Sequence, residues 1–227
     1  MQMSQLRTAT QCAAQYGVKA IVYGGPGSGK TPLLKTLPRP VLCATEPGLL
    51  SLRGDTSIAV WEAHTPAKID EFFAWVKGSN EVHNFDTIAV DSVSQMAEIY
   101  LKDALTKNKH GLKAYGDMAK ATLPHLEDLY YMQNKHVCLV AKQNLSQEGG
   151  GIVKKRPYFP GNEINVKVPH LYDEILHVGI TQVPGQAGHQ KCIRTVETLE
   201  ITARDRSGRL AELEPCDLAA IFAKCMS

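Results

Sequence analysis

A glycine-rich segment at residues 24–31 is the part of the sequence whose residue types and spacing have the clearest chemical meaning. It reads Gly24, Gly25, Pro26, Gly27, Ser28, Gly29, Lys30, Thr31, is followed by Pro32, and matches the P-loop pattern GxxxxGK[ST] at every specified position. In such a loop, backbone N–H groups surround phosphate oxygens, the lysine reaches the β- and γ-phosphates, and the threonine hydroxyl binds Mg²⁺. The pattern therefore predicts that residues 24–32 bind ATP and that Thr31 is a ligand of Mg²⁺.

Three polar residues that follow apolar, strand-like runs are candidates to complete this site. Asp91 is the candidate second Mg²⁺ ligand, with capping of the next helix as the alternative. Glu46 is the candidate to orient the attacking water, with an exposed turn residue as the alternative. Gln143 is the candidate sensor of the γ-phosphate, with a simple strand end as the alternative. Because the carboxyl ends of parallel strands share one edge, these side chains are expected near the P-loop.

Two lysine-rich segments, residues 101–120 and 142–160, each have a local net charge of +3, in a chain whose total is only +2. The candidate DNA-binding residues are Lys107, Lys109 and Lys113 in the first segment, and Lys142, Lys154, Lys155, Arg156, Tyr158 and Phe159 in the second. Cations on a mobile backbone with aromatic neighbours suit phosphate neutralisation and base stacking. We therefore expect single-stranded DNA to bind here, with an ordinary solvated loop as the alternative for each segment.

Strand-like and helix-like patterns alternate along most of the chain. Strands are predicted at 18–23, 40–44, 87–90 and 136–141, and helices at 4–15, 30–37, 66–77, 94–105, 115–133 and 215–224. Shorter, partly antiparallel strands are predicted at 174–180, 192–196 and 199–203. This order predicts an α/β fold with a mostly parallel central sheet flanked by helices. We expect one domain, with an N-terminal arm (1–17), a core (18–208) and a C-terminal helix (209–227).

The composition is that of an ordinary globular protein, with 44% hydrophobic and 21% charged residues. The 25 basic and 23 acidic residues exclude a histone-like or polybasic protein. The six cysteines form no CxxC pair and no zinc-type cluster with histidines, which predicts free thiols. No apolar run approaches the roughly 18–20 residues of a membrane span, and the polar N-terminus lacks a signal-peptide pattern, so a cytoplasmic location is expected.

The P-loop, Glu46, residues 88–93 and Gln143 before a glycine run together resemble the RecA/Rad51 recombinase core. In particular, they resemble short phage-encoded RecA-like ATPases that act as single-strand annealing proteins, over residues 18–208. The resemblance implies a RecA-like P-loop fold in which Glu46 activates water and Gln143 couples the nucleotide to a DNA-binding loop. It further implies that the two lysine-rich segments are the DNA-binding loops.

The resemblance also concerns partners. It implies that Arg204 or Arg206 reaches the nucleotide of a neighbouring subunit, with exposed arginines in a turn as the alternative. The expected partners are single-stranded DNA, further copies of the chain in a ring or short filament, and a single-strand-binding protein, in a host cytoplasm. The chain lacks the sizeable C-terminal domain of bacterial RecA, which favours annealing over strand exchange.

Two other functions remain open from the sequence. One is a small-molecule P-loop kinase, which would need an arginine-bearing lid and an acceptor pocket. The other is a binding module in which ATP organises an oligomer and annealing proceeds without hydrolysis. ATP turnover with and without DNA, measured beside strand annealing, separates these functions.

Overall fold

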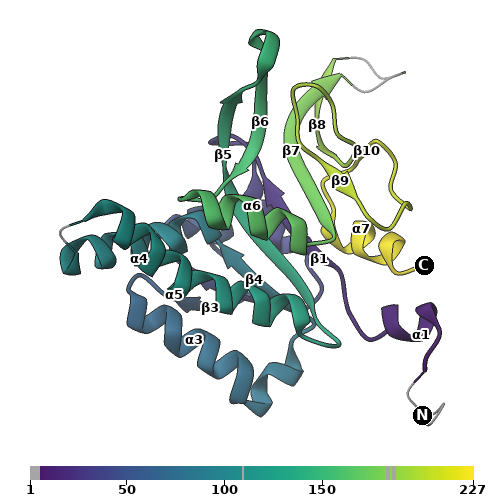
Figure 1. Ribbon diagram of the computed structural model, residues 1–227. Helices are drawn as coiled ribbons and strands as arrows, with labels where there is room; N and C mark the ends of the chain where they lie inside the picture. Colours follow the sequence, from purple (N-terminus) through teal and green to yellow (C-terminus); the bar gives the residue numbers. More distant parts are fainter. Residues whose placement is uncertain (1–5, 109, 183–184, 186–187) are drawn as a thin grey trace.

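The protein is described by a computed structural model that covers residues 6–108, 110–182, 185 and 188–227. Within these residues, helices lie on both faces of one mixed sheet (Figure 1). The strands are β1 (Lys19–Tyr23), β2 (Pro40–Ala44), β3 (Ala59–Glu62), β4 (Thr87–Asp91), β5 (His136–Gln147), β6 (Val153–Tyr158), β7 (Glu174–Gln182), β8 (His189–Arg194), β9 (Arg204–Asp205) and β10 (Leu213–Glu214). The α-helices are α1 (Ala9–Ala13), α2 (Lys30–Leu33), α3 (Pro66–Gly78), α4 (Val93–Lys107), α5 (Gly111–Tyr131), α6 (Asn162–Leu171) and α7 (Leu218–Cys225).

The order of the strands brings several strand ends to one edge of the sheet. The order is β10-β8-β7-β1-β5-β4-β2-β3, and neighbours from β7 to β3 are parallel. β8 and β10 extend the sheet in antiparallel pairing, as the sequence predicted for the C-terminal strands. Because β1, β5, β4 and β2 are parallel neighbours, the segments that follow them meet at the carboxyl edge.

Two apolar clusters, one on each face of the sheet, form the core. Alternate residues of β1 separate the faces, since Ile21 and Tyr23 belong to one cluster and Ala20 and Val22 to the other. Helices α3, α4, α5 and α6 cover the first face. Helices α2 and α7 cover the second face, where Phe222 of α7 is buried. None of the helices in the described residues combines the length and apolar character needed to cross a membrane.

Most predicted elements are present, with small changes at their ends. The helix predicted at 30–37 is split into α2 and a 3₁₀ turn, Leu34–Thr36. Of the helix predicted at 4–15, α1 contains Ala9–Ala13, and residues 1–5 lie outside the described residues. β3 and α6 were not predicted, because β3 is short and α6 contains Pro169 near its end.

Two predictions about the second half of the chain were wrong. Residues 199–203 are not a strand, because only Ile201 makes an isolated bridge, to Lys155. The strand after residue 136 does not enter a mobile loop at Lys142 but continues to Gln147 and pairs with β6. The predicted DNA-binding loop is therefore a β-hairpin with a turn at Gly149–Gly151, which extends away from the helices (Figure 1).

Candidate functional site

The glycine-rich segment forms a loop between β1 and α2, as the sequence predicted. Gly29 has a φ of +93°, in the left-handed region that favours glycine. A Cβ on Gly24 would lie 2.5 Å from the carbonyl oxygen of Val178 in β7, so only glycine fits this close approach. The P-loop is thus fixed both by its own backbone conformation and by its packing on β7.

Lys30 is the first residue of α2 and points back over the P-loop. Its Nζ donates to the carbonyl oxygens of Gly24, at 2.7 Å, and Gly25, at 3.0 Å. Burial lowers the pKa of Lys30, and the carboxylates of Asp91 and Glu46 act in the opposite direction. The ammonium group is therefore held at the loop that phosphate groups would enter.

Thr31 and Asp91 meet at the carboxyl edge and form a donor set suited to Mg²⁺. The Thr31 hydroxyl donates to Oδ2 of Asp91 at 2.7 Å, which joins α2 to the end of β4. Burial raises the pKa of Asp91, and the bond from Thr31 acts in the opposite direction. Capping of α4 falls to Ser92, whose Oγ accepts from the backbone N–H of Gln95 at 3.1 Å. The Asp91 carboxylate is therefore left facing the P-loop, where a hydroxyl and a carboxylate can share a hard cation.

Glu46 lies beside this pair because β2 and β4 are neighbours. The Ser92 hydroxyl donates to Oε1 of Glu46 at 2.7 Å. The hydroxyl of Thr45 donates to the carbonyl oxygen of Ser92 at 2.9 Å, and the Ser92 N–H donates to the same hydroxyl at 3.0 Å. These bonds fix the two strand ends to each other and hold the Glu46 carboxylate next to Asp91.

Gln143 lies on the other side of the P-loop, where β5 leaves the central sheet. Its Nε2 lies 3.9 Å from the position that a Cβ on Gly25 would take. Its Oε1 accepts from Nε2 of His177, on β7, at 3.1 Å. Burial, together with the nearby charges of Lys155 and Arg194, lowers the pKa of His177 to about 4. Gln143 and the neutral His177 therefore form one wall of a cavity of ≈ 470 Å³ beside the P-loop.

This arrangement agrees with the comparison with known protein families. Residues 16–207 match the family described as AAA domain. The chain belongs to the AAA domain family. No match was found among curated proteins. In the mostly parallel sheet, β5 lies between β1, which precedes the P-loop, and β4, which ends in Asp91. AAA domains generally use ATP and Mg²⁺.

Solved structures similar to this AAA domain share little sequence with it. The KaiC-like protein PH0186 from the hyperthermophilic archaeon Pyrococcus horikoshii OT3 is 12% identical, with a TM-score of 0.47 and 79% of each chain covered. The RadB recombinase is 14% identical, with a TM-score of 0.44, 82% of this chain and 86% of that chain covered. The flagellar accessory protein FlaH from Methanocaldococcus jannaschii is 11% identical, with a TM-score of 0.39, 79% of this chain and 78% of that chain covered.

Lys191 and Arg194 of the AAA domain were not among the predicted site residues, although β8 brings both to the P-loop side. Nζ of Lys191 lies 2.6 Å from the position that a Cβ on Gly29 would take. Arg194 lines the cavity beside Gln143. The antiparallel pairing of β8 with β7 places them there, and no motif in the sequence marks them.

The basic residues of the β5–β6 hairpin are mostly ion-paired. Lys154 pairs with Glu197, and Arg156 pairs with Glu148 at 2.5 Å. Lys142 pairs with Glu98 at 2.7 Å. Tyr158 is partly buried, and Lys155 lines the cavity beside Gln143.

Phe159 is a correction to the predicted stacking pair. Only 3% of its surface is exposed, and it belongs to the core cluster under α5 and α6. A ring buried in this way offers no face to a base. Any stacking at this hairpin would therefore fall to Tyr158 alone.

The first lysine-rich segment is helical rather than a loop, which corrects the prediction. Lys107 ends α4 and pairs with Asp103 at 2.5 Å, while Lys113 is on α5 and donates to Oδ1 of Asn108 at 2.7 Å. Lys109, between the helices, lies outside the described residues. Lys107 and Lys113 therefore lie on hydrogen-bonded helical backbone. Their side chains are on the outer, polar faces of the amphipathic helices α4 and α5.

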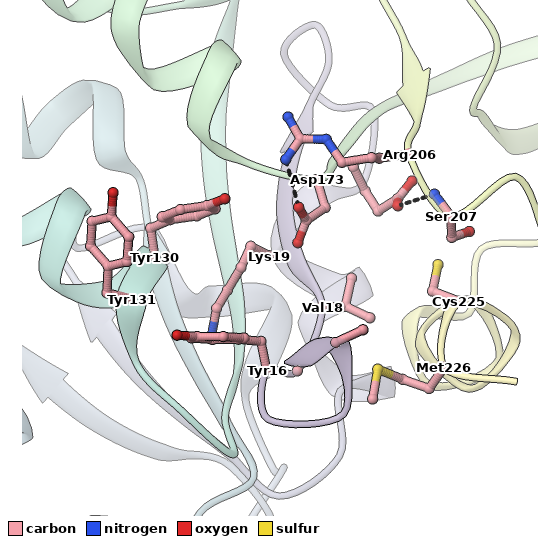
Figure 2. A pocket seen from close by; sticks show the side chains of 13 residues that line it. Tyr16, Val18, Lys19, Tyr130, Tyr131, Asp173, Arg206, Ser207, Cys225 and Met226 are labelled. Atoms are coloured by element: carbon pink, nitrogen blue, oxygen red, sulfur yellow. Dashed lines mark hydrogen bonds and ion pairs between the residues drawn. The ribbon is translucent and has the colours of Figure 1, made fainter. Parts of the chain in front are cut away.

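Arg204 and Arg206, the predicted fingers, bind groups of their own chain. Arg204 Nη2 donates to the carbonyl oxygen of Pro169 at 2.5 Å. Arg206 Nη1 donates to Oδ1 of Asp173 at 2.9 Å, a bond that Figure 2 shows. Both follow or form β9, which pairs with the first residues of β7 at the amino edge. These guanidinium groups are therefore bonded within their own chain at the amino edge. Arg206 is exposed in the bend after β9, as the alternative expected, whereas Arg204 is half-buried in β9.

Proposed function

We propose that this AAA domain is a Mg²⁺-dependent ATPase that binds single-stranded DNA and promotes annealing of complementary strands, with DNA stimulating hydrolysis. The observation that carries the proposal is a set of contacts that join the P-loop and the preceding strand, β1, to the basic β5–β6 hairpin. Tyr23, the last residue of β1, donates from its hydroxyl to the carbonyl oxygens of Lys155, at 3.1 Å, and Thr202, at 2.5 Å. Gln143 begins the same hairpin and lies beside Gly25.

The nucleotide step follows from the residues at the carboxyl edge. Thr31 and Asp91 would hold Mg²⁺, which on binding neutralises charge on the β- and γ-phosphate oxygens. Lys30 would exchange the loop carbonyls for phosphate oxygens. The Glu46 carboxylate, fixed by Ser92, is suited to orient a water molecule for attack on the γ-phosphate.

Coupling to DNA would run through the hairpin. A change in the position of the Gln143 side chain on nucleotide binding would move β5, because Gln143 is itself a residue of that strand. Tyr23 connects β1 to the backbone of β6 at the same level. The hairpin therefore contacts the P-loop through Gln143 on β5, and it contacts β1, the strand that leads into the P-loop, through the backbone of β6.

DNA binding by the hairpin is compatible with its ion pairs. The pairs of Lys154 and Arg156 have partners that are at least one-third exposed, and such pairs generally stabilise a fold by less than about 1 kcal/mol. A phosphate backbone, with many charges and released counterions, can displace such partners. Self-association and a single-strand-binding partner belong to the same proposal and rest on the sequence resemblance.

The test combines ATP turnover, DNA binding and strand annealing. The hairpin variant carries Lys154→Gln, Lys155→Gln and Arg156→Gln, and the control variant carries Lys68→Gln, Lys77→Gln and Lys167→Gln on α3 and α6. Both lose the same charge. Because each lost phosphate contact removes about 0.7 from the slope of log K against log salt, we expect the hairpin variant's slope to fall by about 2. The control keeps the wild-type slope.

Several outcomes would contradict the proposal. Absence of DNA binding at low salt would refute the DNA-binding part, and equal slopes in the two variants would remove the hairpin from the DNA site. ATP turnover that DNA leaves unchanged would refute the coupling. If Glu46→Gln stops turnover while annealing continues, ATP acts as a regulator and not as the energy source for annealing.

A further inference from the structure

A second cluster of reactive side chains lies at the amino edge of the sheet, away from the P-loop. Glu174 begins β7, Asp205 is on β9, and Cys225 is the last residue of α7. One oxygen of each carboxylate and the Cys225 sulfur all lie within 4.8 Å of one another. Three elements that are distant in the sequence therefore bring two carboxylates and a thiol to one point.

Glu174 is the least compensated member of this cluster. Only 1% of its surface is exposed. Its Oε1 accepts from the backbone N–H of Ser207 at 3.3 Å, whereas Oε2 is buried and has no hydrogen-bond partner among the described residues. Ion pairs among the described residues include neither Glu174 nor Asp205. A buried carboxylate is ordinarily paired with a cation or bound to a metal ion.

The cationic side chains around this cluster form hydrogen bonds or ion pairs with other groups. Lys19 donates to the carbonyl oxygens of Met132 and Lys135, at 2.8 and 2.7 Å. Arg206 pairs with Asp173. Lys224, beside Cys225 on α7, pairs with Glu214. Arg204, whose charge acts on Glu174 from a distance, donates to the carbonyl oxygens of Pro169 and Tyr172. Among the described residues, no cationic side chain forms an ion pair with the Glu174 carboxylate.

Burial also shifts the pKa values of two residues of the cluster. Burial, together with the neighbouring Asp205 carboxylate, raises the pKa of Glu174 to about 8. Burial raises the pKa of Cys225 to about 12.

We propose that Glu174, Asp205 and Cys225 bind a divalent transition-metal ion, for which Zn²⁺ is the best match. Zinc accepts one thiolate and carboxylate oxygens in a four-coordinate site, with water as a fourth ligand. A soft sulfur ligand favours zinc over Mg²⁺ and Ca²⁺, which take oxygen ligands. The site is separate from the proposed ATPase function and would fasten the C-terminal helix α7 to β7 and β9.

Access to the site is provided by a cavity of ≈ 390 Å³. Glu174, Ser207 and Cys225 line it, together with Tyr16 and Arg206. Figure 2 shows the Cys225 sulfur pointing from α7 toward Ser207. The side chains of Glu174 and Cys225 therefore border a cavity through which an ion can approach the cluster.

The test uses Co²⁺ as a spectroscopic substitute for Zn²⁺ in the full-length chain, free of histidine tags and treated with a chelator. A thiolate ligand gives Co²⁺ a charge-transfer absorption in the near ultraviolet, and a four-coordinate site gives strong visible bands. We expect both in the wild-type chain, with one equivalent of Zn²⁺ removing them and raising the thermal unfolding midpoint. Cys216→Ser replaces another partly buried thiol and serves as the control.

Two variants remove ligands. Cys225→Ser is expected to abolish the charge-transfer band, and Glu174→Gln, which resembles the protonated carboxyl and should fold normally, to weaken Co²⁺ binding by at least about tenfold. Cys216→Ser keeps the wild-type spectrum. The proposal is overturned if the wild-type chain gives no such spectrum, which would leave Glu174 and Asp205 sharing a proton. It is equally overturned if Cys225→Ser keeps the wild-type band.

Discussion

The two edges of the sheet each hold a carboxylate whose pKa burial raises, but the two differ in how that charge is compensated. At the carboxyl edge, Asp91 accepts from the Thr31 hydroxyl and has the Lys30 ammonium nearby. At the amino edge, Glu174 has one weak backbone donor and a like charge, Asp205, as its neighbour. The difference shows that the chemistry of a carboxylate removed from water depends on which donors the neighbouring elements supply.

Their local sequences differ in the same way. The residues around Asp91 belong to recognisable motifs, so its partners can be anticipated from the sequence. Glu174 is one acidic residue at the start of a strand, and its partners come from 31 and 51 positions further along the chain, at Asp205 and Cys225. Short sequence motifs thus mark the residues of the site at the carboxyl edge. The residues of the site at the amino edge are brought together only by tertiary packing.

The largest expected effect at the carboxyl edge is that of Lys30→Ala. Removing a cation aimed at the developing charge of the γ-phosphate should lower ATP turnover by about 10³-fold. Lys35→Ala, an exposed lysine in the turn after α2, is the matched control. Turnover is measured by phosphate release at saturating ATP, and equal activity in the two variants would show that the P-loop does not act as proposed.

A smaller effect is expected for Glu46→Gln. Loss of the group that orients water should lower turnover by about 10²-fold, while ATP binding stays close to wild type. The variant keeps the size of the side chain and can still accept from Ser92. Fluorescent-nucleotide titration with single-turnover kinetics separates the two quantities. A loss of binding as large as the loss of turnover would mean that Glu46 serves the fold of the site.

The pH dependence of stability tests solvation at the carboxyl edge. Because the pKa of His177 falls from 6.5 to about 4 on folding, the unfolded chain binds more protons between these values. Stability should therefore rise with pH from about 4 to 6.5, and His177 contributes up to about 3 kcal/mol to that rise. This contribution of His177 to the free energy of unfolding is lost as the pH falls from about 6.5 to about 4.

Urea unfolding of His177→Asn across this pH range is the measurement. The variant's stability should change less with pH than that of the wild-type chain. His64→Asn, which replaces an exposed histidine, is the control. Burial also lowers the pKa of His125 and His136, so the difference between the curves isolates the part due to His177. Parallel curves would mean that His177 is well solvated.

The smallest expected effect is that of Lys191→Ala. Its ammonium lies against Gly29, where a bound phosphate would gain a charge-assisted contact. Such a contact contributes about 1.5–3 kcal/mol, so we expect ATP to bind at least about tenfold more weakly. Lys68→Ala on α3 is the control. Unchanged ATP affinity would leave Lys191 as a packing residue beside the P-loop.

Much of the fold could be read from the sequence because the central strands are continuous apolar runs. β1, β2 and β4 are bounded by glycine, proline or acidic residues, and each lies where the pattern predicted. The hairpin was predicted as a loop because, apart from Leu145, residues 142–147 are polar and do not alternate with apolar residues. Such a stretch becomes a strand only when a partner such as β6 supplies backbone hydrogen bonds.

Tertiary contacts also decided which individual side chains are accessible to a ligand or a neighbouring subunit. Phe159 was predicted to stack on bases, but helices packed over it from elsewhere in the chain bury it. Arg204 and Arg206 were predicted to be available to a neighbour, but the carbonyl oxygens near the end of α6 take up their donors. Side-chain availability depends on the surroundings, and these are set by contacts distant in sequence.

By itself, the sequence determined the P-loop, the strand that ends in Asp91, the location of Glu46 and the mostly parallel α/β class, because these depend on local backbone conformation and short-range periodicity. Only the tertiary structure decided that Gln143 meets His177, that Lys191 lies against Gly29, and that Glu174, Asp205 and Cys225 converge. Each of these contacts joins strands or helices whose register is set by burial of the whole sheet, which no short segment encodes.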